Sequence, residues 1–131
     1  MREIKFRAWD KGLKRWTNYS IDDGLLMFYD EHADCWEIDR EGERFILCQF
    51  TGLKNINGKE IYEGDIVRAV GFLKWIGVAK YSDKNQAFVF EGIDKNYRGN
   101  IVFMSQFDQG FKILGNIYEN PELLKELTND D

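Results

Sequence analysis

The sequence has few of the residues that build disulfide frameworks and metal centres: its 131 residues include two cysteines, one histidine and one proline. Cys35 and Cys48 have neither the close spacing nor the histidine partners of a zinc site, and two cysteines do not make a disulfide scaffold. No apolar run is long enough to span a membrane, and the charged start Met1–Lys5 is unlike a signal peptide. We therefore expect a cytoplasmic protein with reduced thiols, with no cofactor, no metal and no membrane partner.

The motifs of common enzyme classes are also missing. The chain has no Walker loop, no dinucleotide-binding glycine pattern and no Gly-x-Ser-x-Gly turn. The single histidine, His32, lies in the polar segment Asp30–Asp34, where a surface-loop residue is favoured over a general base or a metal ligand. Cys48 lies in the apolar run Ile46–Cys48, which favours a buried thiol over a nucleophile. We therefore expect no enzymatic activity and no catalytic residue.

Aromatic residues and glycines, in contrast, are plentiful. The composition is 15% aromatic with 12 glycines, which favours strands and turns, and the length suits a single domain over residues 1–131. Residues 1–20 carry six basic and two acidic side chains, whereas residues 21–44 carry two basic and nine acidic ones. Two solvated faces are favoured over one binding face, and the net charge of −5 argues against a general nucleic-acid coat protein.

The first residues predict an N-terminal hairpin. Side chains in the segment Ile4–Trp9 alternate with a period of two, which is typical of a half-buried strand. The turn Asp10–Gly12 then leads into a second strand, Arg15–Ile21, which is expected to pair with the first.

The next part of the chain predicts further strands around an acidic loop. Leu25–Tyr29 is short and apolar, and it fits either a strand or one helical turn. Cys35–Ile38 and Phe45–Phe50 are predicted to be strands that pair around the turn Arg40–Glu43.

The central run Gln49–Val67 contains two turn signals. Asn57-Gly58 is typical of a two-residue hairpin loop, and Glu63-Gly64 precedes an apolar strand. Asn120 and Pro121 predict the N-terminus of a short C-terminal helix that ends near Leu127 and docks on the sheet. Further strands are predicted at Asp65–Val70, Gly77–Tyr81, Ala87–Glu91, Asn100–Ser105 and Phe111–Leu114.

The spacing of these elements predicts the fold class. Tyr62–Val67, followed by Gly77–Tyr81 and Phe88–Phe90, looks like the strand order of SH3-like barrels. We therefore expect an all-β protein, mostly β with a short C-terminal helix. It would form a small barrel of SH3-like strand order plus the N-terminal hairpin.

Three stretches carry a resemblance to a known family. They are Arg2–Asp10, the run Gln49–Val67 and Gly115–Leu124, and they follow one another in the expected order. In these stretches the chain resembles the YopX-like proteins, a family encoded by phages and prophages. The resemblance implies a phage- or prophage-encoded all-β protein, and it carries over no catalytic residue.

The N-terminal hairpin holds the candidate binding residues. Basic groups interleaved with aromatics suit phosphate contacts with base stacking, and they also suit a protein interface. The same pattern suits plain packing, in which Trp9 and Trp16 pair across the strands while the long basic side chains lie over them. Packing is the favoured interpretation, then a protein or self-association surface, then nucleic acid. The candidate residues are Lys5, Arg7, Trp9, Arg15 and Trp16.

A second group, Glu60, Glu63 and Asp65, lies beside the two turns of the central run. Acids near a hairpin end suit a divalent cation. The favoured interpretation is structural, with Asp65 capping the Glu63-Gly64 turn by accepting hydrogen bonds from backbone N–H groups.

These observations lead to two favoured hypotheses about function, and a third, enzymatic one rests on His32 and the acids beside the two turns. The first is a phage- or prophage-encoded, non-enzymatic interaction protein that binds a host or phage protein, or a second copy of itself. The alternative is a small-barrel nucleic-acid-binding protein that uses the basic aromatic hairpin, and the net acidity of the chain makes it the less favoured one.

Overall fold

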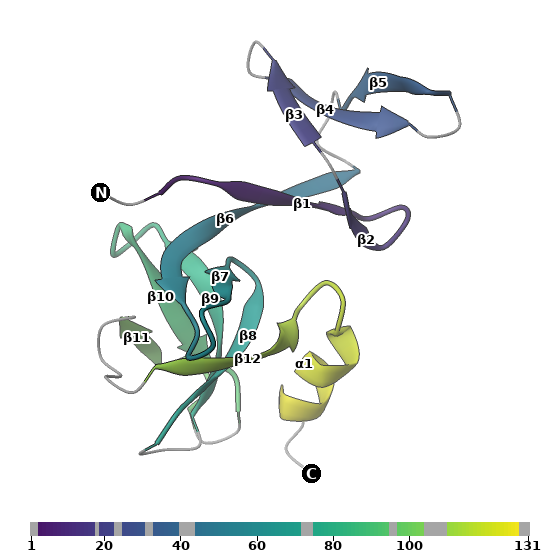
Figure 1. Ribbon diagram of the computed structural model, residues 1–131. Coiled ribbons are helices and arrows are strands. Elements are labelled where there is room, and N and C mark those ends of the chain that lie inside the picture. The colour runs from purple at the N-terminus through teal and green to yellow at the C-terminus, as the bar shows by residue number, and fades with distance from the viewer. Residues whose placement is uncertain are drawn as a thin grey trace. The chain divides into compact units, whose positions relative to one another are not determined.

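The computed structural model (Figure 1) describes most of the chain in eight segments. By its contacts the chain divides into two compact units, residues 5–49 and residues 1–4 with 50–131. That residues 1–131 form a single domain stays a prediction. The described segments are 3–17, 19–22, 25–30, 33–39, 44–71, 75–94, 97–103 and 110–128.

Strands make up most of the described chain, and a single short helix lies near its C-terminal end, so the prediction of an all-β protein with a C-terminal helix is confirmed. The elements are β1 (Phe6–Asp10), β2 (Arg15–Thr17), β3 (Tyr19–Asp22), β4 (Leu25–Asp30), β5 (Cys35–Ile38), β6 (Phe45–Lys54), β7 (Glu60–Tyr62), β8 (Asp65–Ala69), β9 (Ile76–Ser82), β10 (Ala87–Gly92), β11 (Ile101–Phe103), β12 (Phe111–Asn116) and α1 (Pro121–Thr128).

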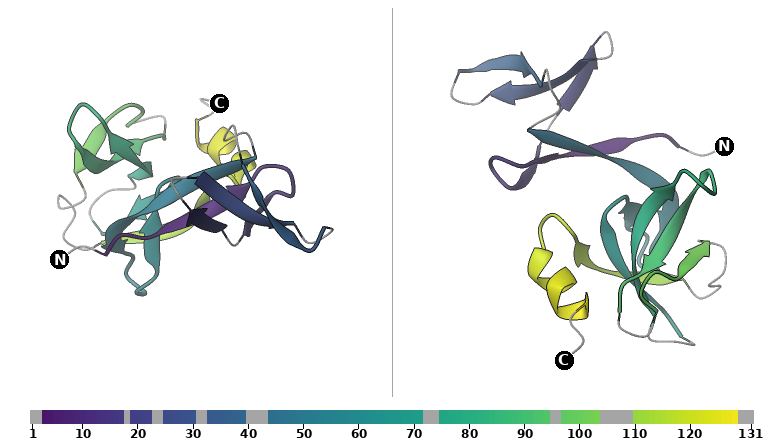
Figure 2. Two further views of the ribbon diagram at one scale, coloured as in Figure 1. Left: turned by 90° about the horizontal axis from the view of Figure 1, so that it is seen from above. Right: turned by 180° about the vertical axis from the view of Figure 1, so that it is seen from behind.

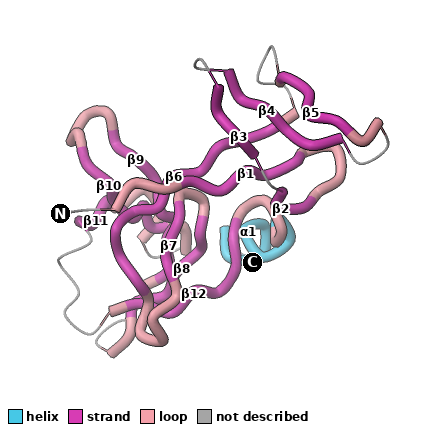
Figure 3. Tube along the Cα trace, turned by 45° about the horizontal axis from the view of Figure 1, so that its top comes forward, coloured by secondary structure: helices cyan, strands magenta, loops and turns pink. Residues whose placement is uncertain are grey.

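The unit of residues 5–49 contains strands of two antiparallel sheets. In the first sheet, of order β2-β1-β6-β7, strand β1 lies between β2 and the first half of β6. The second sheet has the order β3-β4-β5, and Figure 3 shows these three strands as neighbours. The strand β5 therefore has a partner on one side, β4, and forms an outer edge of its sheet.

Two predicted features of this unit are wrong in detail. The expected strand Arg15–Ile21 is two strands, because β2 pairs with β1 whereas β3 pairs with β4 in the other sheet. Cys35–Ile38 is a strand as predicted, but it pairs with β4 rather than with Phe45–Phe50. The reason is that Leu25–Tyr29 is a strand, not a helical turn, and it supplies a partner that is closer in sequence. The predicted turn at 40–43 lies outside the described residues.

The unit of residues 50–131 is built on a five-stranded antiparallel sheet of order β11-β10-β9-β8-β12. Figures 1 and 2 show this sheet as strongly curled. The ring centroids of Phe90 and Phe111 are 4.3 Å apart in the core, in an edge-to-face arrangement. The SH3-like strand order stays a prediction. The buried core consists of Ile61, Val67, Ala69, Trp75, Ala79, Phe90, Val102 and Phe111.

The turns predicted in the central run are present. Gly58 closes the β6–β7 hairpin with a φ of 84°, and Gly64 directly precedes β8 with a φ of 90°. Both values lie in the region that glycine enters without steric cost. An ideal Cβ on Gly64 would lie 2.6 Å from the Tyr118 ring, whereas a Cβ on Gly58 would meet nothing within 4 Å.

The C-terminal helix follows a turn organised by Asn116, whose Oδ1 accepts hydrogen bonds from the N–H groups of Tyr118 and Glu119. Asn120 was predicted to cap the helix. Its backbone oxygen accepts the Leu123 N–H at 3.0 Å, but its side chain accepts the N–H of Asn116 instead. Leu123 is half-buried, and the side chain of Leu127 and the terminal residues 129–131 lie outside the description.

Candidate functional site

The β1–β2 hairpin holds the residues that the sequence singled out. Its turn spans residues 11–14, and the Lys14 N–H donates to the Asp10 carbonyl at 2.7 Å. The Asp10 carboxylate accepts hydrogen bonds from the N–H groups of Gly12 at 2.9 Å and of Leu13 at 3.1 Å. Because this turn fixes the register, Trp9 lies directly opposite Trp16.

The aromatic residues of the hairpin pack against one another. The ring centroids of Trp9 and Trp16 are 5.1 Å apart at an interplanar angle of 67°, which is an edge-to-face contact. The guanidinium carbon of Arg7 lies 3.9 Å from the Trp16 ring centroid. The structure thus contains the packing that the sequence favoured, with the tryptophans paired and the arginine over a ring.

The five predicted binding residues do not share one face. Side chains alternate along a strand, so Lys5, Arg7 and Trp9 lie on one face together with Trp16. Arg15 lies opposite Asp10 and therefore belongs to the other face. Trp9 is only 5% exposed, because β1 is a central strand and Ile46 lies opposite Trp9 on β6. A binding role for these residues stays a prediction.

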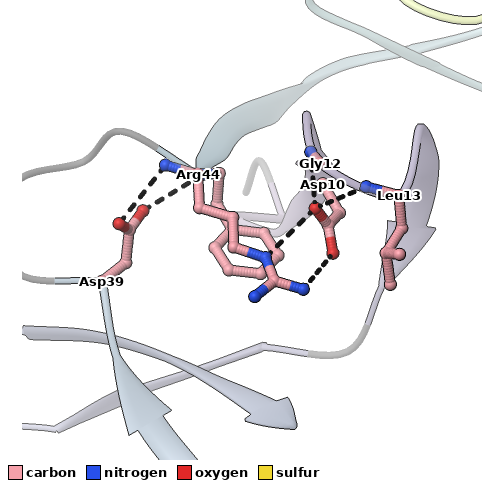
Figure 4. A network of polar contacts seen from close by, with 6 residues as sticks. Asp10, Gly12, Leu13, Asp39 and Arg44 are labelled. Carbon is pink, nitrogen blue, oxygen red and sulfur yellow. Dashed lines mark hydrogen bonds and ion pairs between the residues drawn. The ribbon is translucent and has the colours of Figure 1, made fainter. Parts of the chain in front are cut away.

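A polar network that the sequence did not indicate joins β1 to the start of β6 (Figure 4). Nε and Nη2 of Arg44 each donate to the Asp10 carboxylate at 3.3 Å. Asp39, just after β5, accepts the N–H of Phe45 at 3.1 Å and the N–H of Arg44 at 3.4 Å. Asp10 is 2% exposed, so these contacts compensate the burial of a charge.

The ionisation of Asp10 follows from this network. Burial by itself raises the pKa of the carboxyl. Hydrogen bonds from the Arg44 guanidinium and from the N–H groups of Leu13 and Gly12, together with the positive charge of Arg44, outweigh burial and hold that pKa below its usual value. Asp10 therefore acts as a structural anion that holds the hairpin turn and the start of β6.

A second candidate surface lies on the β3-β4-β5 sheet. Tyr29 and Trp36 lie opposite each other on β4 and β5, with ring centroids 5.7 Å apart at an interplanar angle of 70°. They are 38% and 46% exposed, and the Tyr29 hydroxyl donates to Asp34. A hollow of about 390 Å³ lies beside them. We call this the β5 surface: Met27, Tyr29, Trp36, Glu37 and Ile38.

The register explains the composition of the β5 surface. Met27 lies opposite Ile38 and Tyr29 opposite Trp36, so these four side chains lie on one face of the sheet. Met27, Trp36, Glu37 and Ile38 line the hollow. None of these residues is a candidate from the sequence alone, because Leu25–Tyr29 fits either a strand or a helical turn.

The other residues that the sequence suggested for chemistry either have a structural role or lie outside the described residues. Cys48 is 1% exposed, which confirms the prediction of a buried thiol. Asp65 accepts the Tyr62 N–H at 2.9 Å, which confirms its predicted role in the turn. His32 lies outside the described residues. Within the described segments, no three or more His, Cys, Asp or Glu residues gather as metal ligands would.

The helical residues that the structure describes do not form a segment with the length and hydropathy that a membrane crossing needs.

Comparison with known proteins shows a family and a similar solved structure. The model of the YopX protein family matches residues 5–125. The crystal structure of protein EF1440 from Enterococcus faecalis is similar, with a TM-score of 0.59 and 26% sequence identity. That similarity covers 95% of this chain and 99% of the other chain. No curated protein matches.

Proposed function

We propose, since this chain belongs to the YopX protein family, that it is a phage- or prophage-encoded interaction protein that binds a protein partner or a second copy of itself. The proposal includes no catalytic step and no cofactor. It places the protein in the cytoplasm of the bacterial host cell. The partner is a host or phage protein.

The exposed aromatic pair on the β5 surface is the observation that supports this proposal. Tyr29 and Trp36 are the kind of rigid aromatic side chains that carry binding energy at protein interfaces. Both are more than a third exposed although they lie in regular strands. A large aromatic surface in contact with water is costly, and it is often retained for a partner.

Binding to nucleic acid through the β1–β2 hairpin is the second candidate function. It is supported by the half-buried Lys5 and by the half-buried Arg7, which lies beside Trp16. It is weakened by the burial of Trp9 and by the position of Arg7 over the Trp16 ring, because stacking on a base needs a free aromatic face.

Light scattering on the purified chain, with absorbance recorded at two wavelengths, tests both functions. The interaction proposal predicts a discrete homo-oligomer, or a monomer that forms a defined complex with a protein captured from host lysate, free of nucleic acid. A monomer that carries nucleic acid, released as salt is raised, would reverse the ranking, because phosphate contacts weaken steeply with salt.

A further inference from the structure

We infer that the outer edge of β5 binds an extended segment of a partner protein that carries lysine or arginine side chains. The inference rests on the proposed function and names the surface and the chemistry of the partner. The segment would lie along Trp36, Glu37 and Ile38, with a cationic side chain against Trp36.

The backbone of β5 provides the first argument. In the sheet of order β3-β4-β5, the outer side of β5 has no neighbouring strand among the described residues. An edge strand presents N–H and C=O groups that an added strand can pair with. Cys35, Trp36 and Glu37 are all exposed along this edge. A partner segment therefore has backbone access to the strand.

The hollow beside β5 provides the second argument. It is lined by Met27, Trp36 and Ile38, whose side chains share one face of the sheet, and by Glu37, which lies between the last two on β5. An alternating segment has side chains on both faces, so it can place one group in such a hollow while its backbone follows the edge. A long side chain with a positive end suits a hollow of this composition, because its stem packs on the apolar residues.

Charge identifies the partner as cationic. Residues 21–44, which contain β4, β5 and the second half of β3, carry nine acidic and two basic side chains. Glu37 and Asp34 are exposed, and neither is paired with a cation in a described ion pair. Trp36 offers an exposed ring for a cation–π contact. An acidic or neutral segment would lack both attractions.

The same charge argues against a second copy as the occupant. Two β5 edges pairing with each other would bring two strongly acidic segments together, which is unfavourable. If β5 bound the basic hairpin of another copy, the contact would be head-to-tail. Such contacts build open filaments unless the rotation between successive copies closes a ring. A separate partner protein therefore fits the surface better than this chain itself.

A fluorescently labelled peptide of about eight residues that alternates lysine with valine tests the inference on the full chain. We expect saturable binding in low salt that weakens as salt is raised, and no binding of the matched glutamate–valine peptide. Two further lysine–valine peptides carry methyl groups on backbone nitrogens, one peptide at its odd-numbered residues and the other at its even-numbered residues. One of the two should lose binding, because one set of N–H groups faces β5. Equal binding by both methylated peptides would show that no strand is added and would overturn the inference.

Substitutions locate the peptide on the protein. Trp36→Ala should weaken binding about tenfold, and Glu37→Lys should weaken it by a similar factor. Tyr81→Ala is the matched aromatic control, because Tyr81 is 45% exposed and also makes an edge-to-face contact, with Phe88. Glu122→Lys, at an exposed position of α1, is the matched charge control. Equal losses in the test and control variants would overturn the inference.

Failure of this inference is distinguishable from failure of the proposed function. If the wild-type chain and the Trp36→Ala variant form the same complex with a captured host protein, the interaction function stands and the β5 edge is not its site. If the wild-type chain is a monomer that forms no complex at all and binds no peptide, both proposals fail.

Discussion

Asp10 and Arg44 are 34 residues apart in the sequence, and the Arg44 guanidinium donates to both carboxylate oxygens of Asp10 at 3.3 Å. The contact ties the β1–β2 turn to the residue that precedes β6. It is possible because Asp10 lies opposite Phe45 on the neighbouring strand, which places Arg44 one residue away. The carboxylate also holds the turn through Gly12 and Leu13, so one side chain stabilises both local and long-range structure.

Replacing Asp10 by asparagine removes the charge but keeps the size of the side chain. We expect Asp10→Asn to lower the free energy of unfolding by about 1–3 kcal/mol, because a buried group in a charged hydrogen-bond network is lost. Urea denaturation measures the change. Asp83→Asn in the exposed β9–β10 turn is the control and should change the free energy by less than about 0.5 kcal/mol. Similar values for the two variants would contradict a structural role for Asp10.

The same carboxylate predicts how stability depends on pH. The pKa of Asp10 is lower in the folded chain than in the unfolded chain, so its contribution is fully present above the unfolded value near 3.8. That contribution is lost as the pH falls through the folded value. Urea midpoints of the wild type and of Asp10→Asn should therefore differ most well above pH 3.8 and converge as the pH falls below that value. A difference that is constant with pH would contradict the assignment.

The Trp16 ring makes an edge-to-face contact with Trp9, and it also contacts the guanidinium of Arg7. We expect Trp16→Ala to destabilise the chain by about 1–3 kcal/mol, since it removes both contacts and part of the buried area. Thermal or urea unfolding measures this change. Leu13→Ala is the control, because Leu13 is 52% exposed and only its backbone N–H bonds to Asp10. A wild-type stability for Trp16→Ala would show that this packing contributes little.

Alanine substitutions at Gly64 and Gly58 separate the effect of backbone conformation on stability from the effect of packing. Both have a φ near 90°, so alanine at either position is strained. Only at Gly64 would the new Cβ collide with a ring, that of Tyr118. We expect Gly64→Ala to be less stable than Gly58→Ala by about 1–3 kcal/mol, as measured by the urea midpoint. Equal urea midpoints for the two variants would contradict a contribution from the contact with Tyr118.

Several features of the fold were predictable because they depend on a few adjacent residues. Asn57-Gly58 and Glu63-Gly64 are turns because their glycines adopt φ values that other residues avoid. The strand Cys35–Ile38 was predicted with its observed bounds. The membership in the YopX family, suggested by three stretches, is confirmed over residues 5–125.

Strand pairing was less predictable because it is decided by partners that are distant in sequence. The segment Arg15–Ile21 continues in a strand-like pattern, yet its two halves join different sheets. The face of Arg15 depended on register, since a shift of one residue exchanges the two faces of a strand. The β5 surface could not be predicted until Leu25–Tyr29 was known to be a strand beside Cys35–Ile38.

Trp9 and Trp36 have similar neighbours in the sequence, but the tertiary structure gives them different burial. Each tryptophan lies between a small residue and an acid, in Ala8-Trp9-Asp10 and Cys35-Trp36-Glu37, so the sequence alone determined that both lie in strands but not how far either ring is buried. The structure makes Trp9 5% exposed and Trp36 46% exposed. The physical reason is position in the sheet. The strand β1 has neighbours on both sides, whereas β5 lies at an edge, and the area that a ring buries depends on strands supplied by other parts of the chain.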